Sequence, residues 1–142
     1  MKNKIIKNKG FTILEAIIAV SIITIGIISL LIFSQNAVLT IYHARNNLTA
    51  VYLAKEGMEN IRNIRDQNLL RGANWNSGIS SRAVAPLFID DGFYNQNTGT
   101  PTKFTREIII TSIPNFDGIN VRTIVRWAEH SFSIEENLYN WR

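Results

Sequence analysis

Cysteine is absent from all 142 residues of the chain. Its absence excludes disulfide scaffolds, zinc sites built from thiolates, iron–sulfur clusters and cysteine nucleophiles. Motifs of nucleotide-binding proteins, zinc proteases and serine hydrolases are also missing, and the two histidines, His43 and His130, lie far apart and away from any acidic cluster with ligand spacing. We therefore expect no enzyme, no catalytic residue, no metal site and no cofactor. Asp90 and Asp91, followed by a glycine, could contribute to a calcium loop, but adjacent acids in a loop more often mark a turn.

Charged residues are also scarce, at 18% of the chain, against about 25% in average soluble domains. The shortage has one location, because no Asp, Glu, Lys or Arg occurs between Glu15 and Arg45. The net charge of +4 comes from four lysines in the first ten residues, Lys2, Lys4, Lys7 and Lys9, since the other eleven basic residues equal the eleven acidic ones. A nucleic-acid-binding protein would cluster its charge on a folded surface. We therefore predict no nucleic-acid partner.

The uncharged stretch contains a run long enough to cross a membrane. Residues Phe11 to Phe33 are 23 residues with one charge, and as a helix they would span about 35 Å against a hydrocarbon core of about 30 Å. The lysines before it orient the N-terminus toward the cytoplasm. This predicts a single pass through the inner (cytoplasmic) membrane, in contact with its lipid. A cleavable secretory signal would have a shorter apolar core and a small-residue cleavage site, which is missing here.

Glu15 is the residue that a plain membrane anchor does not explain. It lies five positions into the apolar run, where an acid costs roughly 2.5–3.5 kcal/mol and is a functional candidate when a partner can be named. The alternative is that Glu15 reaches back to the headgroups near the start of the helix and has no further role.

The run Lys9-Gly10-Phe11-Thr12-Ile13-Leu14-Glu15 resembles the processing site of type IV prepilins and type II secretion pseudopilins. The resemblance covers residues 1 to about 35. It implies that prepilin peptidase cuts between Gly10 and Phe11 and methylates the freed amine of Phe11. It also implies that Glu15 compensates the amino terminus of a neighbouring subunit when the helices pack into a filament. The implied partners are the peptidase, other pilins or pseudopilins, and the inner-membrane assembly platform.

Proline is also scarce, and its first occurrence is Pro86. Many major pilins carry a proline within this helix, so this chain departs from that pattern and lacks a proline kink. Residues 36–71 contain no helix breaker, and apolar residues recur at spacings of three and four: Ile41, Ala44, Leu48, Val51, Ala54, Met58 and Ile61. Gly57 could mark close packing of the helix against the domain, and Gly72 is a plausible C-terminal end of the helix. The pattern predicts one helix over about 12–71.

The remainder is predicted to be a small domain of loops and antiparallel strands. Residues 72–101 are rich in Gly, Asn, Ser and Thr, with one short strand expected at Leu87–Ile89. Residues rich in β-branched side chains predict further strands, and Asp117-Gly118 is a turn signal. These strands are Phe104–Ile113, Ile119–Ala128 and Ser131–Trp141. The expected class is α+β and pilin-like, with the second half of the helix packed on a small antiparallel β-sheet.

Four segments follow from these patterns: a basic leader at 1–10, a transmembrane and filament-core helix at 11–35, its amphipathic continuation at 36–71, and the strand domain at 72–142. We expect a structural minor pilin of a type IV pilus, first in the membrane and then in the pilus at the cell envelope. The C-terminal segment is similar, more weakly, to small minor pilins of the pilus-modification kind. The alternatives are a minor pseudopilin of a type II secretion or DNA-uptake system, and an uncleaved membrane-anchored binding module.

Overall fold

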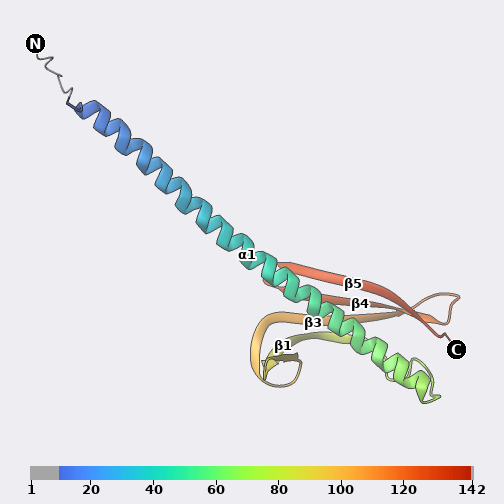
Figure 1. Cartoon of the computed structure of the whole chain (residues 1–142). Helices are drawn as coiled ribbons and strands as arrows, with labels where there is room; N and C mark the ends of the chain where they lie inside the picture. Colours follow the sequence, from blue (N-terminus) through green and yellow to red (C-terminus); the bar gives the residue numbers. More distant parts are fainter. Residues whose placement is uncertain (1–9, 142) are drawn as a thin grey trace, which may run out of the picture. The chain divides into compact units, whose positions relative to one another are not determined.

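The computed structural model describes residues 10–141 and contains one long helix followed by five strands (Figure 1). The predicted basic leader therefore lies outside the described residues, apart from Gly10. The helix and strands have these bounds: α1 Ile13–Leu70, β1 Arg82–Asp90, β2 Phe93–Asn95, β3 Thr100–Ser112, β4 Gly118–Trp127 and β5 His130–Tyr139. The strands form one antiparallel sheet in the order β2-β1-β3-β4-β5. The predicted α+β, pilin-like class is confirmed.

Helix α1 belongs to two compact units, one ending at His43 and one beginning at Ala44. In the first unit the hydroxyls bond back to carbonyls one turn earlier: Ser21 to Ile17 at 2.7 Å, Thr24 to Val20 at 2.6 Å and Ser29 to Ile25 at 2.8 Å. These bonds satisfy the hydroxyls within the helix itself, as an apolar environment requires. The helix ends as predicted, because the N–H of Gly72, in a left-handed conformation with φ of 69°, donates to the carbonyl of Leu69.

The second unit is built by packing the end of α1 on one face of the sheet. One apolar cluster lies toward the C-terminal end of the helix and a second lies nearer Ala50. The first contains Met58, Ile61, Leu69, Trp75, Ile108, Ile119, Val121 and Leu138. The second contains Ala50, Leu53, Ala54, Leu87, Phe104, Val125 and Trp127. Alternate residues of β4 enter these clusters, as expected for a sheet with one covered face.

The buried face of α1 differs in part from the predicted one. Ala54, Met58 and Ile61 are buried as predicted, and Val51 is half-buried, but Ile41, Ala44 and Leu48 are exposed. The buried line runs instead through Asn46, Ala50, Leu53 and Gly57. Apolar spacing missed this line because a polar residue and a glycine belong to it. The Oδ1 of Asn46 accepts a hydrogen bond from the Nζ of Lys103 at 2.6 Å, which makes its burial tolerable.

The sheet contains the predicted strands, and one of them, β1, is longer than predicted. The hairpin of β3 and β4 and the third strand β5 are present within a few residues of their predicted bounds. However, β1 has nine residues where a strand of three was expected within a loop-rich stretch. Asp91 and Gly92 form the two-residue turn between β1 and β2, with φ of 48° and 80°. Both values are positive, as a tight hairpin turn requires.

Candidate processing and assembly site

Gly10 and Phe11 lie just before the start of α1 and are exposed. Neither residue is helical, and 73% of Phe11 is accessible. A side chain added at Gly10 would meet nothing within 4 Å. The peptide bond between these two residues, which is the predicted cleavage site, is therefore outside the hydrogen-bonded helix and open to an approaching enzyme.

Thr12 follows Phe11 and caps the N-terminus of α1. Its Oγ1 accepts a hydrogen bond from the backbone N–H of Glu15 at 3.3 Å, and its carbonyl accepts one from Ala16 at 3.1 Å. This is the geometry of a helix N-cap, and a glutamate three residues after a threonine is the sequence pattern of a capping box. Sequence reasoning missed this role of Thr12, although the Thr-x-x-Glu spacing was a visible signal.

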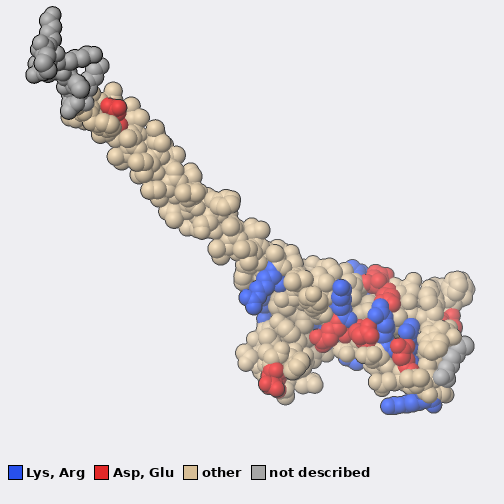
Figure 2. All heavy atoms as spheres, viewed as in Figure 1, with Lys and Arg blue, Asp and Glu red and all other residues tan. Residues whose placement is uncertain are grey.

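Glu15 consequently belongs to the first turn of α1. A carboxylate there interacts favourably with the positive end of the helix dipole. Figure 2 shows the start of the helix as an uncharged surface with one acidic group, and Glu15 is the only acid in that part of the sequence. The geometry brings Glu15 within one turn of Phe11, the residue predicted to carry the new amino terminus.

The first unit of α1 exposes a continuous apolar surface. Between Ile13 and Phe33 every large apolar side chain is more than half exposed, from 51% at Ile18 to 82% at Ile13. Such a surface marks a membrane or protein contact. Helix α1 is long and apolar enough to cross a membrane by length and composition.

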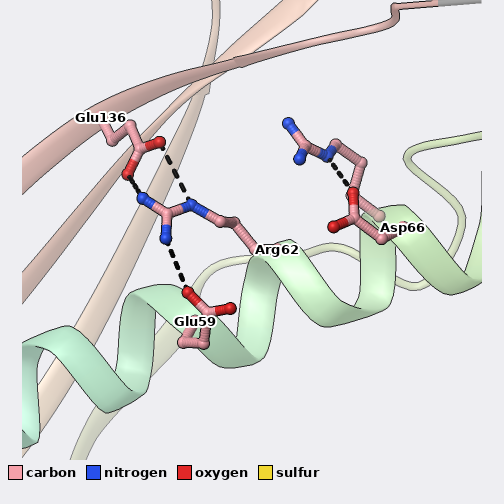
Figure 3. A network of polar contacts seen from close by, with 5 residues as sticks. Glu59, Arg62, Asp66 and Glu136 are labelled. Carbon is pink, nitrogen blue, oxygen red and sulfur yellow. Dashed lines mark hydrogen bonds and ion pairs between the residues drawn. The ribbon is translucent and has the colours of Figure 1, made fainter.

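A second polar site connects α1 to the edge strand β5 (Figure 3). Arg62 donates from Nε to Glu136 at 3.2 Å, from Nη1 to Glu59 at 2.6 Å, and from Nη2 to the second oxygen of Glu136. The hydrogen bonds to Glu136, followed by those to Glu59, outweigh desolvation and raise the pKa of Arg62 above its ordinary value. Arg62 is thus a permanent cation that ties the strand to the helix.

An open groove of about 520 Å³ lies beside this ion pair. The groove is lined by apolar side chains and by side chains of both charges: Tyr52, Lys55, Glu56, Met58, Glu59, Arg62, Ile134 and Glu136. None of these side chains pairs a nucleophile with a base. Within residues 10–141, no group of three or more His, Asp or Glu side chains is placed to hold a metal ion. His130 instead lies 5.8 Å from the ring of Trp127, and His43 lies 6.0 Å from that of Tyr42.

Comparison with known proteins gives one match. Residues 6–32 match the family model of the prokaryotic N-terminal methylation motif. No curated protein and no solved structure matches the chain. The motif supports a type IV prepilin-like protein, of the pilin or pseudopilin type, whose family is structural rather than catalytic. It implies processing by prepilin peptidase and assembly with other pilins, and with the apolar helix it supports membrane anchoring and a location in the pilus or cell envelope.

Proposed function

We propose that the protein is a minor pilin of a type IV pilus. In this role prepilin peptidase cuts between Gly10 and Phe11, the amine of Phe11 is methylated, and the apolar helix packs among those of other subunits. The observation that carries the proposal is the methylation motif at residues 6–32, together with the exposed Gly10–Phe11 bond one residue before a capped helix.

Cleavage changes both charge and topology in this scheme. The lysines of the leader hold the uncleaved chain at the cytoplasmic face, and their removal leaves Phe11 as the only new cation. In an apolar bundle, the amine of Phe11 and the carboxylate of Glu15 on a neighbouring subunit attract each other far more strongly than in water. Either charge left alone in that bundle is costly, so the pair favours the stagger that joins them. The apolar helix is then a membrane anchor first and a filament core afterwards.

A minor pseudopilin of a type II secretion or DNA-uptake system is the second candidate. The motif and the fold support it equally, because pseudopilins carry the same processing site. Minor rather than major status rests on the small strand domain that begins after Gly72. The genes beside that of this protein distinguish the two systems.

Intact mass measures the central step. The chain is produced in cells with and without a prepilin peptidase, and we expect the peptidase to remove residues 1–10 and add one methyl group. Gly10→Val should block this change. Because nothing lies within 4 Å of a side chain at Gly10, the block would act on recognition by the enzyme and not on the fold. Gly26→Ala, at an equally open glycine, should be processed normally. An intact N-terminus in the unaltered chain would instead support the uncleaved membrane-anchored module.

A further inference from the structure

A small open hollow lies at the end of the folded domain where α1 stops. Its volume is about 230 Å³, against roughly 300–1,000 Å³ for pockets that hold drug-sized ligands. The end of the helix, the loop after it and the C-terminal segment line it: Leu69, Gly72, Ala73, Asn74, Trp75 and Asn140. The β3–β4 turn and the C-terminus lie at this same end of the sheet (Figure 1). A hollow of this size can hold a single small ring.

Hydrogen bonds hold the lining segments in place. The carboxylate of Asp117, in the β3–β4 turn, accepts from Nε1 of Trp75 at 2.9 Å and from Nδ2 of Asn140 at 2.8 Å. The backbone N–H of Asn140 also donates to the carbonyl of Asp117 at 3.0 Å. From the helix, Nδ2 of Asn68 donates to the carbonyls of Trp75 at 3.1 Å and Ser77 at 2.7 Å. The hollow is therefore formed before a ligand arrives, and such preorganisation reduces the cost of binding.

The chemistry of the lining is polar and neutral. None of the described residues that line the hollow is charged. Both carboxylate oxygens of Asp117 accept bonds within the fold, and Arg71, although exposed and next to Gly72 in the sequence, is not part of the lining. Asn74, in contrast, is exposed, and its side chain forms no hydrogen bond within residues 10–141. An amide both donates and accepts, as a hydroxyl does, so this lining suits a neutral ligand with several hydroxyls.

Exposed aromatic rings lie at the same end of the domain. Phe116 precedes Asp117 and Trp141 follows Asn140, so the bonds between Asp117 and Asn140 bring both rings to this end. They are 68% and 61% exposed, and the ring of Phe116 lies 6.4 Å from that of Tyr139. Exposed aromatic faces mark a contact surface. A sugar combines an apolar C–H face with hydroxyls around its edge, and aromatic rings beside amides match both parts.

We propose that the hollow binds one sugar residue of a neutral glycan. Asn74 and Asn140 hold its hydroxyls, and Phe116 and Trp141 contact the apolar face of the glycan. This is a binding role in addition to assembly of the subunit. So small a site makes few contacts, so one copy binds weakly and the site is measured with a multivalent probe.

The experiment uses the full uncleaved chain on beads, in micelles of a detergent without a sugar headgroup. The probes are fluorescent polyacrylamide conjugates, each carrying many copies of one neutral sugar: glucose, galactose, mannose, fucose, N-acetylglucosamine or N-acetylgalactosamine. We expect at least one conjugate to be retained, and to be released by the same sugar in free form. Retention should not change with salt, because the described lining is uncharged.

Two variants test the named contacts. Asn74→Ala and Trp141→Ala should each weaken retention about tenfold, which corresponds to the loss of one contact of about 1.4 kcal/mol. Both side chains are exposed, so neither supports the core. The matched controls are Asn76→Ala, at an exposed asparagine outside the lining, and Phe93→Ala, at an exposed ring on β2. Both controls should be retained like the unaltered chain.

Retention of none of the six conjugates would overturn the inference, as would equal retention by Asn74→Ala and Asn76→Ala. Retention of a sialylated conjugate alone, lost on addition of salt, would assign the binding to a cation such as Arg71 and would also contradict a neutral ligand. If no conjugate is retained and Trp141→Ala is depleted from filaments, this surface meets another subunit instead and the inference fails. Because the beads carry the uncleaved chain, retention of a glycan does not depend on processing by the peptidase.

Discussion

Gly57 is a residue at which α1 and the sheet approach each other closely. A Cβ atom there would lie 2.9 Å from Cγ2 of Thr123 and 3.0 Å from Cδ of Arg106. Arg106 cannot move away freely, because it is buried and its Nη1 donates to the carbonyl of Leu53 at 3.0 Å and to Glu56 at 3.2 Å. The expectation that this glycine marks close packing is confirmed, and the side chains that require it come from β3 and β4.

We expect Gly57→Ala to lower the free energy of unfolding by about 1–2 kcal/mol. Crowding of a packed core costs roughly 1–3 kcal/mol, and the gain in helix propensity is at most about 1 kcal/mol. Denaturant unfolding of the full chain in micelles measures the difference. Gly26→Ala, where a side chain meets nothing within 4 Å, should not destabilise the domain. If the Gly57→Ala chain is as stable as the original, the Thr123 and Arg106 side chains can shift to make room for the added methyl group.

At the scale of elements, the long helix could be predicted almost to its ends, whereas its buried face could not. The bounds follow from local chemistry: a threonine cap at one end, Gly72 at the other and no breaker between them. The buried face depends on what the sheet presents. Lys103 makes it possible to bury Asn46, and the Arg106 and Thr123 side chains require a glycine at position 57. Neither fact is contained in the apolar spacing of the helix.

The length of β1 was underestimated because residues 72–101 are rich in Gly, Asn, Ser and Thr. Pro86, in the middle of β1, also argues against an interior strand. The structure accommodates it in two ways. The register of β1 against β3 shifts between Pro86 and Phe88. In addition, β2 pairs only with residues 88–90, so β1 behaves as an edge strand at Pro86. The methylation motif, in contrast, could be predicted in full from the sequence, because its spacing is local and needs no tertiary contact.

Strand β5 presents a long edge to solvent, while the opposite edge, β2, has three residues. The pairing of β5 with β4 is regular over all ten residues, which makes the free edge a template for another strand. Glu136 points from this edge toward the helix side and pairs with Arg62. An inward charge on an edge strand is a known protection against pairing between copies. Both side chains are more than a third exposed, so the ion pair itself adds at most about 1 kcal/mol to stability.

We therefore expect Glu136→Val to promote self-association more than unfolding. The substitution makes the face of β5 that carries Phe132, Ile134 and Leu138 apolar along this regular edge, and it removes the charge that would be buried when two edges meet. Sedimentation of the full chain in micelles, at increasing protein concentration, should show a rising mean mass. Glu129→Val removes the same charge in the turn outside the strand and is the matched control. Identical sedimentation of the two variants would mean that another feature protects the edge.

At the scale of the whole molecule, the distribution of charge divides the chain into an uncharged helical stretch and a charged folded domain. The stretch from residue 16 to residue 44 is uncharged and exposed in the single chain, and the folded domain carries nearly balanced charge held in ion pairs such as Arg62–Glu136 and Arg126–Glu107. The domain folds around its own core, whereas the apolar stretch is stable only in lipid or among other helices. Glu15 lies directly before that stretch, and we propose that it pairs with the amino terminus of a neighbouring subunit.

Glu15 has two proposed roles, a charge partner for the amine of an adjoining subunit and a member of a capping box with Thr12, whose Oγ1 accepts a hydrogen bond from the N–H of Glu15. Two substitutions separate them. Glutamine at 15 keeps a side chain suited to the capping box but has no charge, whereas alanine has neither property. We expect Glu15→Gln and Glu15→Ala both to be cleaved normally, and both to be depleted from sheared filaments. The depletion should be about a hundredfold, because leaving one buried charge unpaired costs roughly 3 kcal/mol or more. Quantitative mass spectrometry of filament and membrane fractions measures it, with Glu129→Gln as the control for charge. Normal incorporation of Glu15→Gln beside a depleted Glu15→Ala would assign Glu15 to the helix cap and remove the charge pair from the assembly mechanism.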